Sequence, residues 1–183
     1  MSSIHIRMWS GDEVRLRSDE IVEVYGEAFA PPPNNEDEAS VREFAGRFPA
    51  HLDRPGFRFV AATDDQDALM GFAYGHTGGP QYWWYQRVTA TLPPDVRDRW
   101  LGDYFEVLEV AVRPGWQGRG IGAKVFDALL AGLPHRTAAL STLAEPSVAR
   151  TMYERRGFTP VLSGFSFVPG EPPFTVLARD LPR

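Results

Sequence analysis

The sequence contains no cysteine, which excludes disulfide bonds, a thiol nucleophile and a cysteine-ligated metal centre. Its four histidines are scattered without the spacing of a metal site, so we expect no bound metal. Lys124 is the only lysine, and a net charge of -5 gives no electrostatic support for a nucleic-acid partner. A long apolar run is also missing, which argues against a signal peptide or membrane helix. We therefore expect a cytoplasmic protein without a membrane partner.

The rest of the composition is ordinary for a globular protein. Apolar residues make up 43% of the 183 positions and charged residues 23%, which is enough apolar surface for a sizeable core. We find no internal repeat and no linker-like stretch. The sequence therefore predicts one α/β (α+β) domain over residues 1–183.

Hydrophobic periodicity predicts the elements of this domain. Alternation and short apolar runs predict strands at 4–9, 57–63, 69–76, 104–112, 137–143, 158–168 and 174–178, with the second and third forming a hairpin. Helical spacing predicts helices after Ser18, over 36–48 and 95–101, after residue 120 and from Pro146. We interpret Ser18 as an N-cap, Pro146 as a first helical residue and Val148 as part of a core stripe.

Residues 77–103 form an unusually long connection that contains the run Tyr82-Trp83-Trp84-Tyr85. A connection of this length is usually functional or has structure of its own. One strand face cannot bury four consecutive aromatic residues, so we expect some of them to line a pocket or a subunit contact. Both a wall of an acceptor site and a homodimer interface remain open.

The most informative stretch runs from Tyr104 to Leu133, where an apolar strand, a glycine turn and an amphipathic helix follow one another. Glycines occupy positions 118, 120 and 122, where the helix should begin. Glycine lets the backbone approach a ligand, and the first N–H groups of a helix lie unpaired at the positive end of its dipole. The turn is therefore a predicted anion site, to which Arg119 adds donors suited to phosphate.

The glycine spacing fits neither the phosphate loop of nucleoside-triphosphate-binding proteins nor the dinucleotide fingerprint. The pattern Gln117-x-x-Gly120-x-Gly122 after the strand 108–112 instead resembles the acetyl-CoA signature of the GNAT superfamily of N-acetyltransferases. Residues 147–158 match a second block of that family. The resemblance implies the GNAT fold, a central mixed, mostly antiparallel twisted sheet of about seven strands, splayed at its central strands and flanked by about four helices.

The resemblance also implies a reaction, the direct transfer of an acetyl group from acetyl-CoA to a primary amine. Tyr153 matches the family tyrosine that protonates the leaving thiolate, and a phenol with a reference pKa of about 10 still carries its proton near neutral pH. The acceptor is expected to be a small-molecule or peptide amine, and the link at residues 31–35 is a possible edge of its site. The residues implied in coenzyme binding are Val110, Ala111, Val112, Gln117, Gly118, Arg119, Gly120, Ile121, Gly122 and Ala123.

The sequence does not decide which group is the general base. Glu106 and Glu109 lie in an otherwise apolar strand, where an unpaired carboxylate is costly and where burial can raise its pKa towards a useful range. A structural partner such as an arginine would account for either glutamate equally well. His76, at the end of its strand, and a water chain without a dedicated base are the other candidates.

One position departs from the family pattern, because Pro146 stands where the family often has asparagine. A missing coenzyme contact there leaves open a non-catalytic acyl-CoA sensor of the same fold. A protein that binds a different nucleotide is the third alternative.

Overall fold

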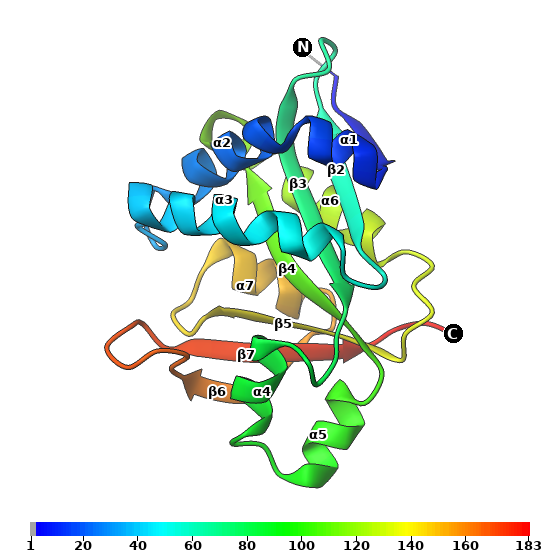
Figure 1. The fold of residues 1–183 in the computed structure, drawn as a ribbon, viewed down its shortest axis with the longest axis vertical. Coiled ribbons are helices and arrows are strands. Elements are labelled where there is room, and N and C mark those ends of the chain that lie inside the picture. The colour runs from blue at the N-terminus through cyan, green and yellow to red at the C-terminus, as the bar shows by residue number, and fades with distance from the viewer. Residues whose placement is uncertain (1–2) are drawn as a thin grey trace. The chain divides into compact units, whose positions relative to one another are not determined.

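The computed structural model describes residues 3–183, which form seven β-strands, seven α-helices and one short 3-10 helix (Figure 1). The strands are β1 (His5–Trp9), β2 (Arg58–Thr63), β3 (Leu69–Thr77), β4 (Tyr104–Val112), β5 (Thr137–Leu143), β6 (Thr159–Phe165) and β7 (Phe174–Asp180). The helices are α1 (Gly11–Leu16), α2 (Ser18–Phe29), α3 (Glu38–Leu52), α4 (Trp83–Thr89), α5 (Pro94–Leu101), α6 (Ile121–Leu130) and α7 (Val148–Glu154), with η1 (Pro114–Trp116) between β4 and α6.

The seven strands form one mixed sheet in the order β1-β2-β3-β4-β5-β7-β6. The pairs β1–β2, β2–β3, β5–β7 and β6–β7 are antiparallel, whereas β4–β5 is parallel. The β4–β5 ladder is short and runs only from Tyr104, opposite Thr137, to Glu106, opposite Ala139. The predicted fold class, a mostly antiparallel mixed sheet splayed at its central strands, is confirmed.

The chain divides into two compact units, which we describe separately. The first holds the described residues up to His76 together with Leu108–Ala131, and the second holds Thr77–Val107 and Gly132–Arg183. The beginning of β4 belongs to the second unit and its end to the first. The single domain expected from the sequence stays a prediction.

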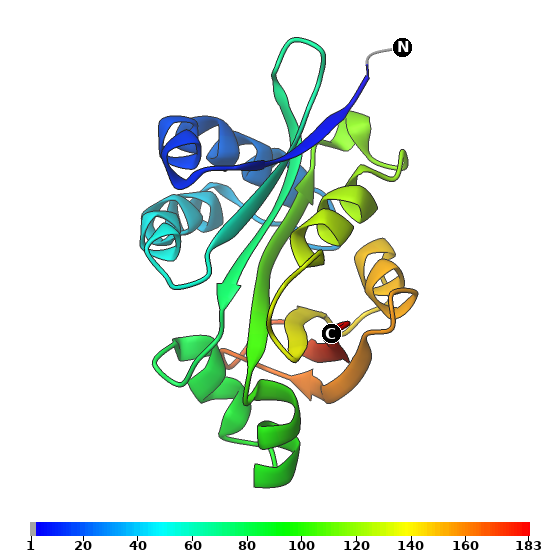
Figure 2. The same ribbon diagram turned by 90° about the vertical axis from the view of Figure 1, so that its right-hand side faces the viewer.

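In the first unit, an aromatic core joins α2 and α3 to the strands. Tyr25 of α2 stacks on Phe44 of α3 with ring centroids 3.8 Å apart, and Phe48 of α3 meets Tyr74 of β3 edge-on at 5.2 Å. All four side chains are buried. Helices α2 and α3 lie on one face of β1–β3, whereas α6 lies on the other (Figure 2).

In the second unit, the aromatic run lies at the start of helix α4, of which Tyr82 is the N-cap. The rings of Trp84 and Tyr85 lie 6.0 and 6.4 Å from that of Tyr104, and Trp84 Nε1 donates to Ser141 Oγ at 3.1 Å. Trp83, by contrast, is 57% exposed. A helix distributes consecutive side chains around its axis, so part of the run packs inward and part faces solvent.

The start of the helical region differs from the sequence prediction. Ser10 and Glu13 form a capping box, in which the Ser10 hydroxyl accepts from the Glu13 N–H and the Glu13 carboxylate accepts from the Ser10 N–H. This box starts α1, which the sequence analysis missed. The N-cap assigned to Ser18 is wrong, because Arg17 precedes α2 and Ser18 is already its first residue.

Two other helix limits also differ. Helix α3 continues through Pro49 to Leu52, whereas apolar spacing indicated an end at residue 48. Pro146 lies outside α7, because Ser147 is the N-cap and its hydroxyl accepts from the Arg150 N–H at 3.1 Å. Val148 is 90% exposed rather than part of the core, and Tyr153 is the buried residue of this helix. With the short helices included, the described residues hold seven α-helices where about four were expected.

Gly71 in β3 lies where this strand closely approaches β4. A Cβ at this position would lie 2.8 Å from Ala111 O and 3.1 Å from Val112 Cγ2. We expect Gly71→Ala to lower the free energy of unfolding by about 1–3 kcal/mol, because the backbone of β4 has to move.

Gly46→Ala is the matched control. A Cβ there meets nothing within 4 Å, and alanine stabilises an exposed helix interior by roughly 0.5–1 kcal/mol relative to glycine. Urea unfolding of the two variants measures the difference, and equal stabilities would contradict a tight contact between β3 and β4.

Candidate functional site

The turn after β4 is held by hydrogen bonds to both neighbouring strands. Arg113 donates its N–H to Met70 O of β3 at 2.8 Å, and η1 follows directly. The Gln117 side-chain amide donates to Val112 O at 2.9 Å, which fastens the turn back onto the end of β4. The predicted turn is therefore a defined loop between strand and helix.

Two glycines with left-handed backbone conformation precede the first turn of α6. Gly118 and Gly120 have φ of 73° and 75°, and Gly120 is the N-cap of the helix. Within residues 3–183 no side chain caps this helix start, so the N–H groups of Ile121, Gly122 and Ala123 have no partner within the helix. A Cβ at Gly118 or Gly120 would meet nothing within 4 Å. Unsatisfied N–H groups at the positive end of a helix dipole, next to open space, fit an anionic group.

Arg119 places a cation on the same turn. Its guanidinium carbon lies 4.8 Å from the ring centroid of Trp116, and its Nη2 donates to Gly115 O at 3.2 Å. Both contacts lie within the turn, and the residue is exposed. A guanidinium stacked on an aromatic ring keeps donors available for phosphate oxygens.

The second half of β4 is unusual for a central strand. The strand is buried at both ends, whereas Leu108, Glu109 and Val110 are partly exposed. The β4–β5 ladder ends before these residues, at Glu106. The strand is therefore partly accessible at Val110, one of the residues that the family resemblance implies in coenzyme binding.

Glu109 is a carboxylate with limited access to solvent. Its side chain is 20% exposed, and its Oε1 lies 3.7 Å from Nη2 of Arg47 in α3. Burial disfavours the charged form and raises the pKa of Glu109 to about 8, an effect that Arg47 opposes and that the charge of Glu36 reinforces. A carboxyl group with this pKa releases its proton just above neutral pH, in the range that suits a general base.

Two buried tyrosines contribute to the surroundings of Glu109. Burial, followed by the charge of Glu109, raises the pKa of Tyr25 and of Tyr74 above the ordinary value for tyrosine. The carboxylate of Glu36, whose Oε2 is buried, contributes further to the raised pKa of Tyr25. Both tyrosines therefore keep their protons and offer neutral hydroxyl groups.

The histidines of this unit are poor candidates for the base. His51 Nδ1 and the Tyr74 hydroxyl are 2.9 Å apart, and burial, assisted by the charge of Arg54, lowers the pKa of His51 to about 3. Arg54 Nη1 donates to His76 Nε2 at 2.8 Å, which occupies the lone pair of that ring. The contacts in this unit thus favour Glu109 over His76 as proton acceptor.

Two of the predicted catalytic residues belong to the second unit. Glu106 is 5% exposed and lies opposite Ala139 of β5. Tyr153 in α7 is buried, and its ring centroid lies 6.3 Å from that of Phe158. The first unit therefore contains Glu109 and the predicted coenzyme residues, whereas Glu106 and Tyr153 are part of the other unit.

Sequence reasoning did not find the residues around Glu109. Tyr25 fits the apolar face of its helix, so its spacing indicates a core residue and says nothing of its hydroxyl. Arg47 lies beside the apolar face of α3, and no local pattern predicts that it pairs with β4. The one sequence feature that pointed to this neighbourhood is the link at residues 31–35, predicted as a possible edge of the acceptor site, because Glu36 directly follows it.

The described part of the chain contains neither a metal-ligating cluster nor a helix that could span a membrane. Residues 3–183 hold no group of three or more His, Asp or Glu side chains arranged to bind a metal ion. Across the same residues, no helix is both long and apolar enough to cross a membrane.

Known proteins share the sequence pattern of this strand, turn and helix. Residues 19–158 match the family model described as the acetyltransferase (GNAT) family. A GCN5-like protein acetyltransferase of Mycobacterium tuberculosis is 36% identical to this chain over 122 residues, which cover 62% of this chain and 59% of that protein. The match thus spans less than two thirds of the relative's length.

Solved structures share the fold over nearly the whole chain. A PaiA N-acetyltransferase from Thermoplasma acidophilum in complex with coenzyme A has a TM-score of 0.60 at 14% identity, covering 97% of this chain and 99% of that one. A GNAT superfamily phosphinothricin acetyltransferase from Sinorhizobium meliloti in complex with acetyl-CoA has a TM-score of 0.61 at 17% identity, covering 97% and 88%. At these identities the likeness establishes the fold alone.

We expect Glu109→Gln to stabilise the protein increasingly as the pH rises from about 5 to about 8. The pKa of Glu109 is about 8 in the folded protein and has its ordinary value of 4.5 when unfolded. Between these values the folded state holds a proton that the unfolded state has released, so wild-type stability falls as the pH rises. Glu109→Gln lacks this pH-dependent loss of stability. Between the two pH values its free energy of unfolding relative to that of the wild type should therefore increase by more than about 1.4 kcal/mol, the free energy of one pKa unit.

Chemical unfolding at the two pH values measures this gain. Glu38→Gln is the control, because the Glu38 side chain is 97% exposed and its replacement should produce no pH-dependent gain. A difference between wild type and Glu109→Gln that does not vary with pH would show that the pKa of Glu109 is ordinary.

Proposed function

The chain belongs to the acetyltransferase (GNAT) family, and from this membership we propose that it moves an acetyl group from acetyl-CoA directly to an amine. The observation that carries the proposal is that one compact unit combines two features. They are an uncapped helix start on a glycine turn and a partly buried carboxyl group of raised pKa on the strand that leads into it. The first fits a diphosphate and the second fits removal of a proton from an amine.

Acetyl-CoA is the proposed cosubstrate. Backbone N–H groups between Gln117 and Ala123 would hold its diphosphate, with Arg119 adding charge, and the edge of β4 at Val110–Val112 would pair with its pantetheine arm. When bound, acetyl-CoA supplies the acetyl group as a thioester. The proposal is supported by two proteins of the same fold whose structures contain coenzyme A or acetyl-CoA.

Glu109 is the proposed general base. The amine loses a proton as its nitrogen attacks the carbonyl carbon, and a carboxylate in a poorly solvated position accepts that proton. Backbone N–H groups at Val110 to Val112 would stabilise the negative charge that develops on the carbonyl oxygen. As the carbon–sulfur bond breaks, the thiolate takes up a proton, for which Tyr153 is the proposed donor. Glu106 is the competing candidate for the base.

The acceptor is proposed to be a small-molecule or peptide amine. The relative from Mycobacterium tuberculosis is named a protein acetyltransferase, which supports an amine on a peptide. Trp83 is the exposed member of the aromatic run, and its two predicted roles, in an acceptor site or in a homodimer, stay predictions.

Gly120→Ala tests the coenzyme turn. A methyl group at this position would enter the open space over the turn, and a φ of 75° strains any residue that has a Cβ. We expect the Kd for acetyl-CoA, measured by calorimetry, to rise by at least about tenfold, which corresponds to about 1.4 kcal/mol.

Gly132→Ala is the matched control for that substitution. Gly132 follows the other end of α6, has a φ of 67° and likewise has nothing within 4 Å of its Cβ position. It therefore carries similar backbone strain away from the turn, and its Kd should equal that of the wild type. Equal affinities of the Gly120 variant and this control would argue against diphosphate binding at the turn.

The pH dependence of acetyl transfer tests the base. A panel of amino acids, polyamines, aryl amines and peptides, followed by release of the free thiol of coenzyme A, identifies a usable acceptor. We expect kcat/KM to rise with pH to a plateau with an apparent pKa of about 8. Glu109→Gln should lower kcat/KM by roughly 10²–10⁴-fold and remove this rise.

Two further variants complete the test. Glu106→Gln should leave the pH profile of kcat/KM unchanged. If the large decrease in kcat/KM occurred in Glu106→Gln instead of Glu109→Gln, Glu106 would be the base. Tyr153→Phe should lower kcat, because the thiolate then lacks its proposed proton donor. Binding of acetyl-CoA without thiol release for any acceptor would favour the acyl-CoA sensor that Pro146 leaves open.

A further inference from the structure

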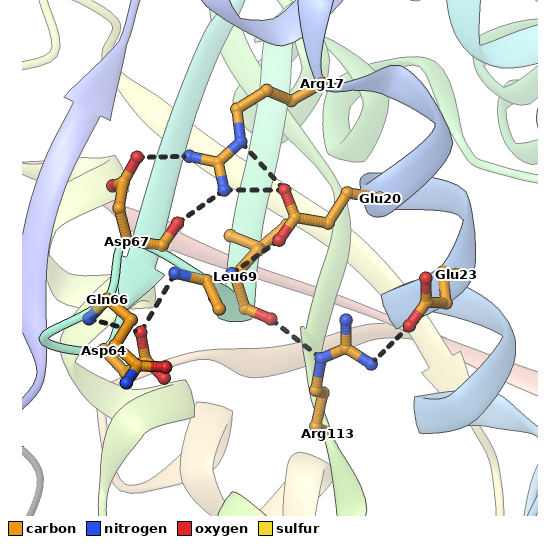
Figure 3. A network of polar contacts seen from close by, with 9 residues as sticks. Arg17, Glu20, Glu23, Asp64, Gln66, Asp67, Leu69 and Arg113 are labelled. Carbon is orange, nitrogen blue, oxygen red and sulfur yellow. Dashed lines mark hydrogen bonds and ion pairs between the residues drawn. The ribbon is translucent and has the colours of Figure 1, made fainter.

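Arg113 joins the root of the glycine turn to two other elements. It is the first residue after β4, and its Nε donates to Leu69 O of β3 at 2.8 Å (Figure 3). Its Nη1 donates to Glu23 at 2.9 Å and to Glu27 at 2.6 Å, both in α2. The Arg113 side chain is only 17% exposed. One guanidinium thus connects β3, α2 and the start of the turn.

A second set of contacts fixes the beginning of α2 independently of the turn. The Leu69 N–H donates to Glu20 Oε1 at 2.7 Å, and Arg17 Nε donates to Glu20 Oε2 at 2.8 Å (Figure 3). Arg17 also donates to the Asp67 carboxylate at 3.0 Å. The start of α2 is therefore held by the β2–β3 hairpin, whereas the contacts of Arg113 lie further along the helix.

Helix α2 carries Tyr25 between the two partners of Arg113. Glu23 and Glu27 are four positions apart in the sequence (i, i+4) and so lie on the same side of the helix. Tyr25 is buried and stacks on Phe44, and burial together with the charges of Glu109 and Glu36 raises the pKa of its hydroxyl. One side of α2 therefore binds the root of the turn, while another side places a tyrosine hydroxyl near the proposed base.

We propose that Arg113 is a positioning residue that makes the placement of α2, and with it that of Tyr25, depend on occupation of the glycine turn by coenzyme A. This proposal rests on the proposed function, because it assumes that the turn binds the coenzyme. Binding of a diphosphate would stabilise the bonded conformation of the turn further, including the bond from the Arg113 N–H to Met70 O at its root. Because the guanidinium of Arg113 bonds to Glu23 and Glu27, less frequent opening of the turn would also mean less frequent opening of the middle and end of α2.

The geometry requires an arginine. Three hydrogen bonds in two directions use the planar donor fork of a guanidinium, whereas the ammonium group of lysine is a point charge on a flexible chain. A lysine at position 113 could retain an ion pair with Glu23 or Glu27 but would lose the simultaneous bond to Leu69 O. We therefore expect Arg113→Lys to retain part of the effect and Arg113→Met to lose it.

Hydrogen exchange of α2 with and without coenzyme A tests the proposal, together with calorimetry of coenzyme A binding. In the wild type, saturating coenzyme A should slow exchange of the α2 amides by at least about tenfold, because local opening of this helix becomes less frequent. In Arg113→Met this slowing should disappear, while the Kd for coenzyme A stays within about threefold of the wild type, since the guanidinium bonds to α2 rather than to the turn.

Two comparisons keep the test specific. Arg15→Met removes an exposed ion pair of 2.6 Å with Asp53 and should leave the exchange response unchanged. The double variant Glu23→Gln, Glu27→Gln removes the partners of Arg113 from half-exposed or exposed positions and should reproduce the loss even if Arg113→Met does not fold.

The possible results separate the two proposals. If Arg113 has only a structural role, the α2 amides of Arg113→Met should exchange faster than those of the wild type by the same factor with and without coenzyme A. Coenzyme A would then still slow exchange of α2 in this variant. That result, or a wild-type α2 that does not respond to bound coenzyme A, overturns the positioning role alone. If calorimetry detects no binding of coenzyme A to the wild type, the proposed function fails and the positioning role fails with it.

Discussion

Partial burial of the Glu109 carboxyl group is the constraint on which the proposed chemistry depends. An apolar side chain at this position of β4 would avoid the cost of removing a charge from water. The ion pair with Arg47 offsets this cost only in part, because its atoms are 3.7 Å apart and the Arg47 side chain is 47% exposed. The residual cost appears as a raised pKa, which leaves the carboxyl group ready to exchange a proton near neutral pH.

In the first unit, β4 connects this group to the predicted coenzyme turn. Glu109 and the turn share β4, and the turn is fixed to the strand ends by Gln117 and by the backbone of Arg113. The side chain of Arg113 then extends this support to α2, which holds Tyr25. Strand β4 thus carries the base, whereas α2 is held both by the stacking of Tyr25 on Phe44 and by the polar contacts of Arg113.

Much of the fold could be predicted from the sequence, because its signals are local. The alternation of β1, the apolar runs of β3 and β4 and the glycines before α6 each specify their element without help from distant residues. Features that depend on competition between neighbouring signals were missed. The Ser10–Glu13 capping box starts a helix before Ser18, and the helix that begins at Trp83 packs the ring of Trp84 on Tyr104 of β4.

The site was predictable only in part for a similar reason. The turn and Glu109 both lie within residues 104–133, so the local sequence pattern of that stretch is enough to predict them. The partners of Glu109 come from α2, α3 and the link between them, far away in sequence, and only tertiary packing brings Arg47 and Glu36 into its surroundings. Likewise, periodicity predicts that Tyr25 is buried but cannot predict which group its hydroxyl meets.

The most direct test of this account is a titration of Glu109 by carbon-13 NMR, with side-chain carboxyl labelling and the Glu109→Gln variant to assign its signal. The account predicts that the carboxyl carbon of Glu109 titrates with a pKa of about 8 in the folded protein. A pKa near the ordinary value of 4.5 would contradict it, because Glu109 would then be a solvated carboxylate without the properties of the proposed base.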